Sequence, residues 1–186
     1  MSTAVHQFKQ PELEKPFRSI KNVLQEYKDR NPKKVALYDL NGNKGISWGE
    51  LHLWANLIAN YLKARGIKKG DRVGLLADES VDKMIIWIGI WRLGAVVCPL
   101  NIEINEAHIR ELLNSIGPKL TLYHADIDGP SITCEVECEL EYFEGWKPQM
   151  DGDANSKNLF NRVAALQPGT EIEEENRPED MSCIFC

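Results

Sequence analysis

Three short apolar runs alternate with two helical patterns in the middle of the chain, and this alternation restricts the possible folds more than any other feature. Residues 72–77, 95–100 and 119–123 are nearly continuous apolar runs, as expected for strands covered on both faces of a parallel sheet. Between them, residues 80–93 and 105–116 carry apolar residues at helical spacing. The order β-α-β-α-β predicts an α/β fold with a doubly wound, mostly parallel sheet.

The residues before this unit predict a helix and a β-hairpin. Apolar residues recur at helical spacing over residues 17–27, with Pro16 in the first turn and Asn31, followed by proline, at the end. Residues 35–40 and 46–48 then read as two short strands, because the asparagines and glycines between them favour a turn.

A second helix has signals at both of its ends. Ser47 and Glu50 have the spacing of a capping box, in which each side chain accepts a hydrogen bond from the other residue's backbone amide. Gly66 is expected to end this helix in a left-handed conformation. The apolar residues between these signals lie on one face: Leu51, Trp54, Leu57, Ile58, Tyr61 and Leu62.

Residues 132–142 change to a period of two and predict a half-buried strand. Its glutamates, from Glu135 to Glu141, form the outer face, and Cys134 and Cys138 point inward as a buried pair of thiols. A solvated face, or protection of a sheet edge against pairing, explains the glutamates better than a metal site, because no other ligand converges on them.

The sequence that follows predicts loops around one short helix. Residues 145–157 have loop composition, and Ser156 is expected to cap a helix that reaches Leu166. Residues 167–179 are acidic and have little to bury. The chain then resumes as an apolar strand over residues 181–186.

These patterns predict a flexible arm at residues 1–15 and one domain over residues 16–186, in which residues 145–179 are rich in loops. Because the last predicted strand follows a long exposed loop and contains the final residue, we expect the domain to be incomplete.

Charge and hydropathy exclude several classes of protein. The formal net charge of −6 gives no electrostatic reason to bind nucleic acid or anionic lipid headgroups. The most apolar stretch, residues 84–91, is far shorter than the roughly 20 residues that span a membrane. The first residues lack the apolar core of a signal peptide, and the five cysteines are expected to be reduced thiols. We therefore expect a protein that is not secreted, and that is cytoplasmic or peripheral to an intracellular membrane.

The sequence contains none of the common motifs for catalysis or phosphate binding. Neither G-x-x-x-x-G-K-[ST] nor G-x-G-x-x-G occurs, and His52, His108 and His124 each stand alone. The last four residues have the form of a prenylation signal, but a final cysteine and an acidic flank argue against it. The residues alone nominate no catalytic and no metal-ligating residue.

Several short segments, in their order and spacing, resemble the adenylate-forming or AMP-binding superfamily, which includes acyl-CoA synthetases, luciferases and the adenylation domains of peptide synthetases. Residues 66–76 have its G-x-x-x-G-D-x-V turn and strand, and residues 87–101 have its apolar helix followed by G-A-x-x-x-P-L-N. Residues 46–51 resemble its S-[YW]-x-E-L segment. Residues 178–186 resemble the strand that leads, in this family, into a Gly/Ser/Thr-rich phosphate loop.

The resemblance implies the N-terminal part of the large domain of an ATP-dependent acyl-CoA ligase. In such an enzyme a carboxylate attacks the α-phosphate of Mg-ATP, and CoA then takes the acyl group. The implied cofactors are ATP, Mg²⁺ and CoA, and the partner is a fatty acid or another carboxylic acid. Because the family's catalytic motifs would lie beyond Cys186, the resemblance places no catalytic residue in this chain, leaves the cofactor-binding residues unknown and implies that the chain alone is inactive.

Within the superfamily, residues 100–104 and the Trp-rich helix at 80–93 are similar to the fatty-acid transport protein and very-long-chain acyl-CoA synthetase branch. Carnitine-CoA and aryl-CoA ligases are alternatives. Two other functions stay open. A non-catalytic short isoform would pair with a partner through an exposed sheet edge. A free-standing nucleotide-binding domain would use the loops after Ala77 and Leu100, although these lack the glycines that let a backbone approach phosphate.

Overall fold

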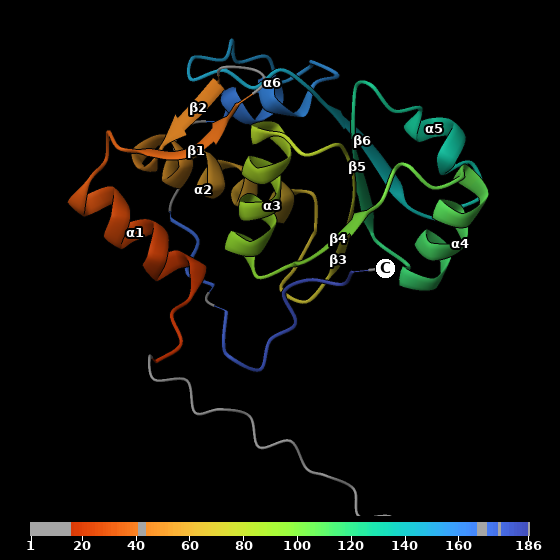
Figure 1. Cartoon of the computed structure of the whole chain (residues 1–186), viewed down its shortest axis with the longest axis horizontal. Coiled ribbons are helices and arrows are strands. Elements are labelled where there is room, and N and C mark those ends of the chain that lie inside the picture. Colours follow the sequence, from red (N-terminus) through yellow and green to blue (C-terminus); the bar gives the residue numbers. More distant parts are fainter. Residues whose placement is uncertain (1–15, 41–43, 167–170, 175, 186) are drawn as a thin grey trace, which may run out of the picture.

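The computed structural model describes residues 16–40, 44–166, 171–174 and 176–185 (Figure 1). Helices and strands alternate along most of this length. The elements are α1 (Ile20–Arg30), β1 (Val35–Asp39), β2 (Lys44–Ser47), α2 (Trp48–Ala64), β3 (Arg72–Leu76), α3 (Val81–Leu93), β4 (Val96–Leu100), α4 (Glu106–Ile116), β5 (Leu120–His124), α5 (Gly129–Ile132), β6 (Glu139–Phe143) and α6 (Leu159–Ala164).

The centre of the fold is a four-stranded parallel sheet in the order β4-β3-β5-β6. The chain passes from β3 to β4 through α3, and then back across β3 to β5 through α4. Because such parallel connections are right-handed, the two helices lie on opposite faces. Figure 1 shows α2 and α3 on one side of the sheet and α4 and α5 on the other. The predicted doubly wound α/β fold is confirmed.

Each face of the sheet has its own apolar core. Alternate residues of a strand point to opposite faces, so Leu75 packs with α2 and α3, whereas Leu76 packs with α4. In the same way, Val97 of β4 belongs to the core with α2 and α3, and Cys98 belongs to the core with α4. Burial on both faces is the reason that these strands are continuous apolar runs.

Polar caps fix the helix ends that the sequence analysis predicted. Ser47 and Glu50 form both hydrogen bonds of the capping box at the start of α2. Ser80 and Asn105 each accept a hydrogen bond from the backbone amide three residues later, at the starts of α3 and α4. Gly94 ends α3 with a φ of 78°. This left-handed conformation is energetically unfavourable for residues that have a Cβ atom.

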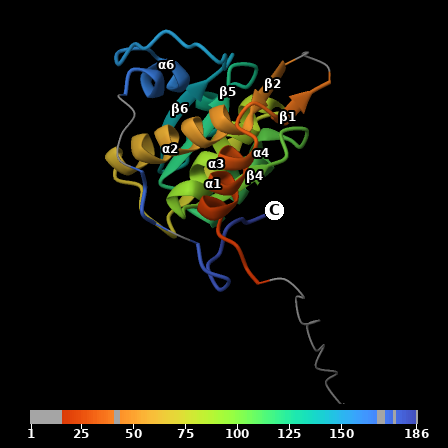
Figure 2. The same cartoon turned by 90° about the vertical axis from the view of Figure 1, so that its left-hand side faces the viewer.

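The first helix begins later than predicted. Ser19 caps α1, and its hydroxyl oxygen accepts a hydrogen bond from the Asn22 amide at 3.3 Å. Pro16 therefore precedes the helix and does not occupy its first turn. β1 and β2 form the predicted antiparallel hairpin, and α1 lies against α2 and α3 (Figure 2).

The predicted strand over residues 132–142 is wrong in its first half. The end of α5 and a turn occupy that half, and β6 forms only from Glu139 onward, parallel to β5. A parallel pair requires the chain to return to the start of the first strand, and these residues make that return. Cys134 is exposed, and Cys138 lies 3.4 Å from the Thr121 hydroxyl, so the two thiols are not a buried pair.

Glu141 contradicts the predicted solvated acidic face. Its side chain is only 3% exposed, and its carboxylate pairs with Arg65 and Arg162, each at 3.0 Å. The hydroxyl of Tyr61 donates a hydrogen bond to the same carboxylate at 2.9 Å. These partners come from the end of α2 and from α6, so one buried carboxylate joins both helices to β6.

Tyr61 is expected to make stability depend on alkaline pH. Burial, the neighbouring Glu141 charge and their hydrogen bond raise the pKa of Tyr61 to about 12, whereas an unfolded chain has a tyrosine pKa of about 10. Stabilisation by protonated Tyr61 is complete below the unfolded pKa and is lost as pH rises from about 10 through about 12. Urea unfolding of the wild type and of Tyr61→Phe, repeated across this pH range, measures the loss. The free energy of unfolding of the wild type should fall more steeply with pH than that of Tyr61→Phe. Equal pH dependence of the two proteins would contradict the raised pKa of Tyr61.

The segment after β6 is packed more closely than its loop composition predicts. Trp146 is fully buried, with its ring centroid 6.1 Å from that of Trp54. α6 is capped by Asn158, not by Ser156, because the Asn158 amide oxygen accepts a hydrogen bond from the Phe160 backbone amide at 3.1 Å.

Residues 171–174 correct the prediction that residues 167–179 have little to bury. Ile172 is 3% exposed, and its amide donates a hydrogen bond to the Asn56 side-chain oxygen at 2.9 Å. A short acidic segment thus contributes to the core between α2 and α3. Residues 167–170 and 175 lie outside the described ranges.

The last described residues run along the outer edge of β4. The Val97 amide donates to the Ser182 carbonyl at 3.1 Å, and the Ile184 amide donates to the Val97 carbonyl at 3.0 Å. Cys183 and Val97 form an isolated parallel bridge. The predicted strand at 181–186 is therefore a single bridge over the described residues, and Cys186 lies outside them.

Candidate functional site

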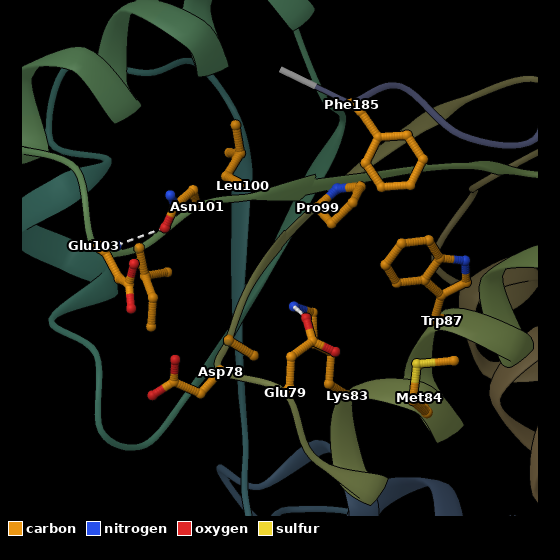
Figure 3. Close-up of a pocket in the computed structure, with 12 residues that line it drawn as sticks. Asp78, Glu79, Lys83, Met84, Trp87, Pro99, Leu100, Asn101, Glu103 and Phe185 are labelled. Carbon is orange, nitrogen blue, oxygen red and sulfur yellow. Dashed lines mark hydrogen bonds and ion pairs between the residues drawn. The ribbon is translucent and has the colours of Figure 1, made fainter.

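An open cleft of about 470 Å³ lies at the carboxyl ends of β3 and β4 (Figure 3). In open α/β sheets, ligands bind beyond the carboxyl ends of the strands. The loops after Ala77 and Leu100, which the sequence analysis singled out, both line this cleft. The lining residues are Ala77, Asp78, Glu79, Lys83, Met84, Trp87, Pro99, Leu100, Asn101, Ile102, Glu103 and Phe185.

One wall of the cleft is apolar and includes two aromatic rings; we call it the aromatic wall. The rings of Trp87 and Phe185 lie 5.9 Å apart at an angle of 45°, and Figure 3 shows Pro99 and Met84 beside them. Phe185 is 75% exposed, and the buried indole nitrogen of Trp87 has no hydrogen-bond partner in the described part of the chain. This wall suits an apolar group of a ligand.

The rest of the lining carries charge, and most of it is negative. Lys83 Nζ lies 2.5 Å from the Glu79 carboxylate; the Lys83 side chain is 7% exposed and that of Glu79 is 82% exposed. Asp78 and Glu103 are also exposed, and the Glu103 amide donates to the Asn101 side-chain oxygen at 2.9 Å. Because the carboxylates outnumber the one ammonium group, these side chains give the cleft a net negative charge and alone do not favour the binding of a phosphate group.

The described lining of the cleft lacks the residue types of the common nucleophile–base pairs. Among the described residues that line the cleft there is no serine, cysteine or histidine, so they offer no nucleophile paired with a base of the Ser-His or Cys-His type. Over the residues that the structure describes, no group of three or more His, Cys, Asp or Glu side chains could hold a metal ion. The cleft is thus a candidate site, to which we assign no catalytic residue.

The isolated histidines of the sequence remain apart from one another and from the cleft. His52 lies in α2, and its ring nitrogen Nε2 is 3.0 Å from Gln25 and 3.3 Å from Glu171. Burial, and to a smaller extent the nearby positive charge of Lys28, lowers the pKa of His52. His108 lies on α4, and His124 ends β5 at 3.2 Å from Asp126. Among the described residues, the cysteines at positions 98, 134, 138 and 183 are free.

Sequence reasoning missed the aromatic wall and the buried ammonium group. Lys83 follows the Ser80 cap by three residues, a signal that could have placed it in the first turn of α3, beside the loop after β3. The Trp87–Phe185 contact had no such signal, because Phe185 reaches Trp87 only through the pairing of residues 182–184 with β4.

A sequence profile of the AMP-binding enzyme family matches residues 24–185 of the chain. The chain belongs to this family. The match includes the sheet, the helices on both of its faces and the cleft at the ends of β3 and β4. The resemblance to the adenylate-forming superfamily is therefore confirmed at the level of the family.

Two relatives illustrate the range of this AMP-binding family. Over 95 residues, or 51% of the chain, it is 32% identical to long-chain-fatty-acid–CoA ligase FadD13 of Mycobacterium tuberculosis, strain CDC 1551. Over 112 residues, or 59% of the chain, it is 30% identical to one component of the plipastatin synthase of Bacillus subtilis. The matched regions are 19% of the ligase and 3% of the synthase component, so the chain corresponds to a small part of each relative.

The fold of this family member also matches solved structures. A long-chain-fatty-acid–CoA ligase, FadD1, from Archaeoglobus fulgidus superposes with a TM-score of 0.79 at 17% identity, over 94% of this chain and 35% of the other. This likeness supports the fold of an adenylate-forming enzyme. Together, the comparisons show an adenylate-forming ligase family, whose relatives are CoA ligases and synthetases.

Proposed function

We propose that the protein containing this chain is an ATP-dependent acyl-CoA ligase that activates a fatty acid. The observation that carries the proposal is the match of residues 24–185 to the AMP-binding enzyme family. The identity to FadD13 and the Trp87–Phe185 wall of the cleft support an apolar acyl group. The assignment to the fatty-acid transport protein and very-long-chain branch is part of this proposal.

The proposed reaction has two steps. A carboxylate oxygen of the fatty acid attacks the α-phosphorus of ATP, so that a new P–O bond forms and pyrophosphate leaves. The CoA thiolate then attacks the acyl carbon of the adenylate, a C–S bond forms, and AMP leaves with the former carboxylate oxygen. Each step exchanges one leaving group for one nucleophile, and no oxidant or reductant is needed.

In this reaction, the chain's own part is to bind and position. The parallel sheet holds the loops after β3 and β4 at one edge, and the aromatic wall offers an apolar surface to a ligand group beside them. Mg²⁺ would neutralise phosphate charge, but the described residues contain no group fitted to hold it, and we assign it no residue. We propose that the catalytic residues lie outside these 186 residues and that the chain alone does not release pyrophosphate.

The whole protein is expected to join CoA to a long-chain fatty acid when ATP is present. Purified protein is incubated with ATP, CoA and one acid per reaction, and mass spectrometry measures the acyl-CoA and AMP. A long-chain fatty acid should give a thioester and one AMP per thioester. Reactions without CoA, or with ADP in place of ATP, are the matched controls. Absence of a thioester with every acid would contradict the proposal.

An amino acid is the second candidate substrate, because the nonribosomal peptide synthetase sirP of Leptosphaeria maculans is 35% identical to the chain over 72 residues, or 39% of the chain and 3% of the synthetase. Amino acids and an aromatic acid such as benzoate therefore belong in the same set of reactions. ATP–pyrophosphate exchange with an amino acid, and no thioester with a fatty acid, would favour this candidate.

A position in the cytoplasm or at the periphery of an intracellular membrane also remains a proposal. Across the described residues, every helix is too short or too polar to cross a bilayer. Sedimentation of the protein with and without vesicles measures peripheral binding.

A further inference from the structure

Arg92 is a buried cation at the end of α3 whose partners belong to a segment far along the chain. The Arg92 side chain is 2% exposed. Its guanidinium donates hydrogen bonds to the backbone carbonyls of Ile172 and Glu174, the latter at 3.2 Å, and lies 3.5 Å from the Glu171 carboxylate. We call residues 171–174 the strap.

The strap also contacts α2, where Glu171 lies 3.3 Å from His52. The Ile172 amide donates to the Asn56 side-chain oxygen at 2.9 Å, and Lys63 Nζ lies 2.6 Å from the Glu174 carboxylate. Asn56 is buried, whereas the Lys63 side chain is 53% exposed, so the Asn56 bond is the stronger restraint. The strap is therefore held from α3 by Arg92 and from α2 by Asn56.

Burial of the Arg92 charge depends on the strap. A buried guanidinium is unfavourable unless hydrogen-bond acceptors replace water, and the strap supplies two carbonyls and a carboxylate. Release of the strap would leave that charge buried with these acceptors missing. The strap is thus docked on the helices as a unit, and loss of either anchor should loosen it.

The described residues after the strap, 176–185, lead to the cleft. A turn is held where Lys69 Nζ lies 2.5 Å from the Asp180 carboxylate. The Ser182 carbonyl then accepts hydrogen bonds from the Trp91 indole at 2.7 Å and from the Val97 amide at 3.1 Å. Figure 1 shows this stretch, in dark blue, running below α3 to the edge of the sheet. Phe185 completes the aromatic wall of the cleft.

We propose that Arg92 is a positioning residue for the cleft: by holding the strap against α2 and α3, it keeps residues 182–184 paired with β4 and Phe185 against Trp87. Arg92 itself does not line the cleft. The role of the cleft in binding substrate rests on the proposed function, but the positioning of its wall does not.

Hydrogen exchange of the 186-residue chain tests this proposal without any activity measurement. In Arg92→Gln, the amides of Val97 and Ile184, which bond across the β4 edge, should exchange about ten- to a hundredfold faster. The amides of β5 should change much less. Arg92→Lys, which restores a cation with fewer and less fixed donors, should recover part of the protection.

Arg110→Gln is the matched control, because Arg110 on α4 also donates hydrogen bonds to two backbone carbonyls, those of Ile132 and Ser131, but on the opposite face of the sheet. In this control variant the Val97 and Ile184 amides should be as protected as they are in the wild type. If Arg92→Gln does not fold, Asn56→Ala, which removes the other anchor, should give the same selective loss of protection. The proposal is overturned if the folded variant protects both amides as the wild type does, or if the control exposes them equally.

This outcome is independent of the reaction that the whole protein catalyses. Selective exposure of the β4 edge together with a failed thioester assay would reject the proposed function and keep the positioning role. Normal thioester formation by the whole protein, with unchanged hydrogen exchange in Arg92→Gln, would support the proposed function and reject the positioning role.

Discussion

Replacement of Glu141 by leucine is expected to lower the free energy of unfolding by about 3 kcal/mol, because it removes two charge pairs and the acceptor of a Tyr61 hydrogen bond from a carboxylate that is itself buried. Arg162 loses the carboxylate at 3.0 Å, and Tyr61 loses its acceptor. For a chain of this size the melting temperature should fall by roughly 6–12 °C. Urea unfolding followed by tryptophan fluorescence measures the change.

Glu139→Leu is the matched control for this prediction. Glu139 lies on the same strand and pairs with Arg65 at 2.6 Å, but its side chain is 59% exposed. An exposed pair of this kind contributes about 0–1 kcal/mol. Equal losses in Glu139→Leu and Glu141→Leu would show that burial of the Glu141 carboxylate does not decide its contribution.

Replacement of Trp146 by alanine is expected to lower the free energy of unfolding by about 3–5 kcal/mol, the usual cost of removing a buried aromatic side chain. The indole packs edge-on against Trp54, and the Lys44 ammonium lies 5.7 Å from its centroid. The Trp146 amide also donates to the Asp82 carboxylate at 3.0 Å, a bond that the substitution leaves in place. The loss should therefore come from the cavity and not from the backbone contact.

Two further variants separate these contributions. Trp146→Phe keeps most of the buried ring and should lose clearly less stability than Trp146→Ala. Trp48→Ala removes a half-buried ring that stacks on Tyr27 at the surface of α1 and serves as the control for removal of a tryptophan. If Trp146→Ala cost no more than Trp48→Ala, the segment after β6 would not be part of the core.

The parallel sheet could be predicted from sequence because its signals are local. Strands buried on both faces have continuous apolar runs, and the helices between them are marked by caps at Ser80 and Asn105 and by Gly94. Each signal depends on residues within a few positions of one another. The chirality of parallel connections then leaves little freedom in the arrangement.

The environment of β6 could not be predicted in this way. A period of two shows that alternate residues face opposite sides, but it does not say what covers each side. Glu141 is buried because Arg65 and Arg162 reach it from distant parts of the chain. Trp146, in a segment of loop composition, is buried for the same kind of reason: Trp54 and Asp82 surround it from α2 and α3.

The cleft was partly predictable. The loops after Ala77 and Leu100 follow from the general position of ligands at the carboxyl ends of parallel strands, and both line the cleft. The aromatic wall could not be predicted without the knowledge that the strap and residues 182–184 dock on α3 and β4. Arg92 gives no sequence signal for this role, since it interrupts an apolar helix that the pattern alone assigns to the core.

Transfer of oxygen from the fatty acid to AMP tests the central claim most directly. The whole protein is incubated with ATP, CoA and a fatty acid labelled with ¹⁸O in both carboxylate oxygens, and AMP is analysed by mass spectrometry. An adenylate-forming ligase should place one ¹⁸O atom in each AMP that accompanies a thioester. Label in inorganic phosphate with formation of ADP, or AMP without label, would contradict the account.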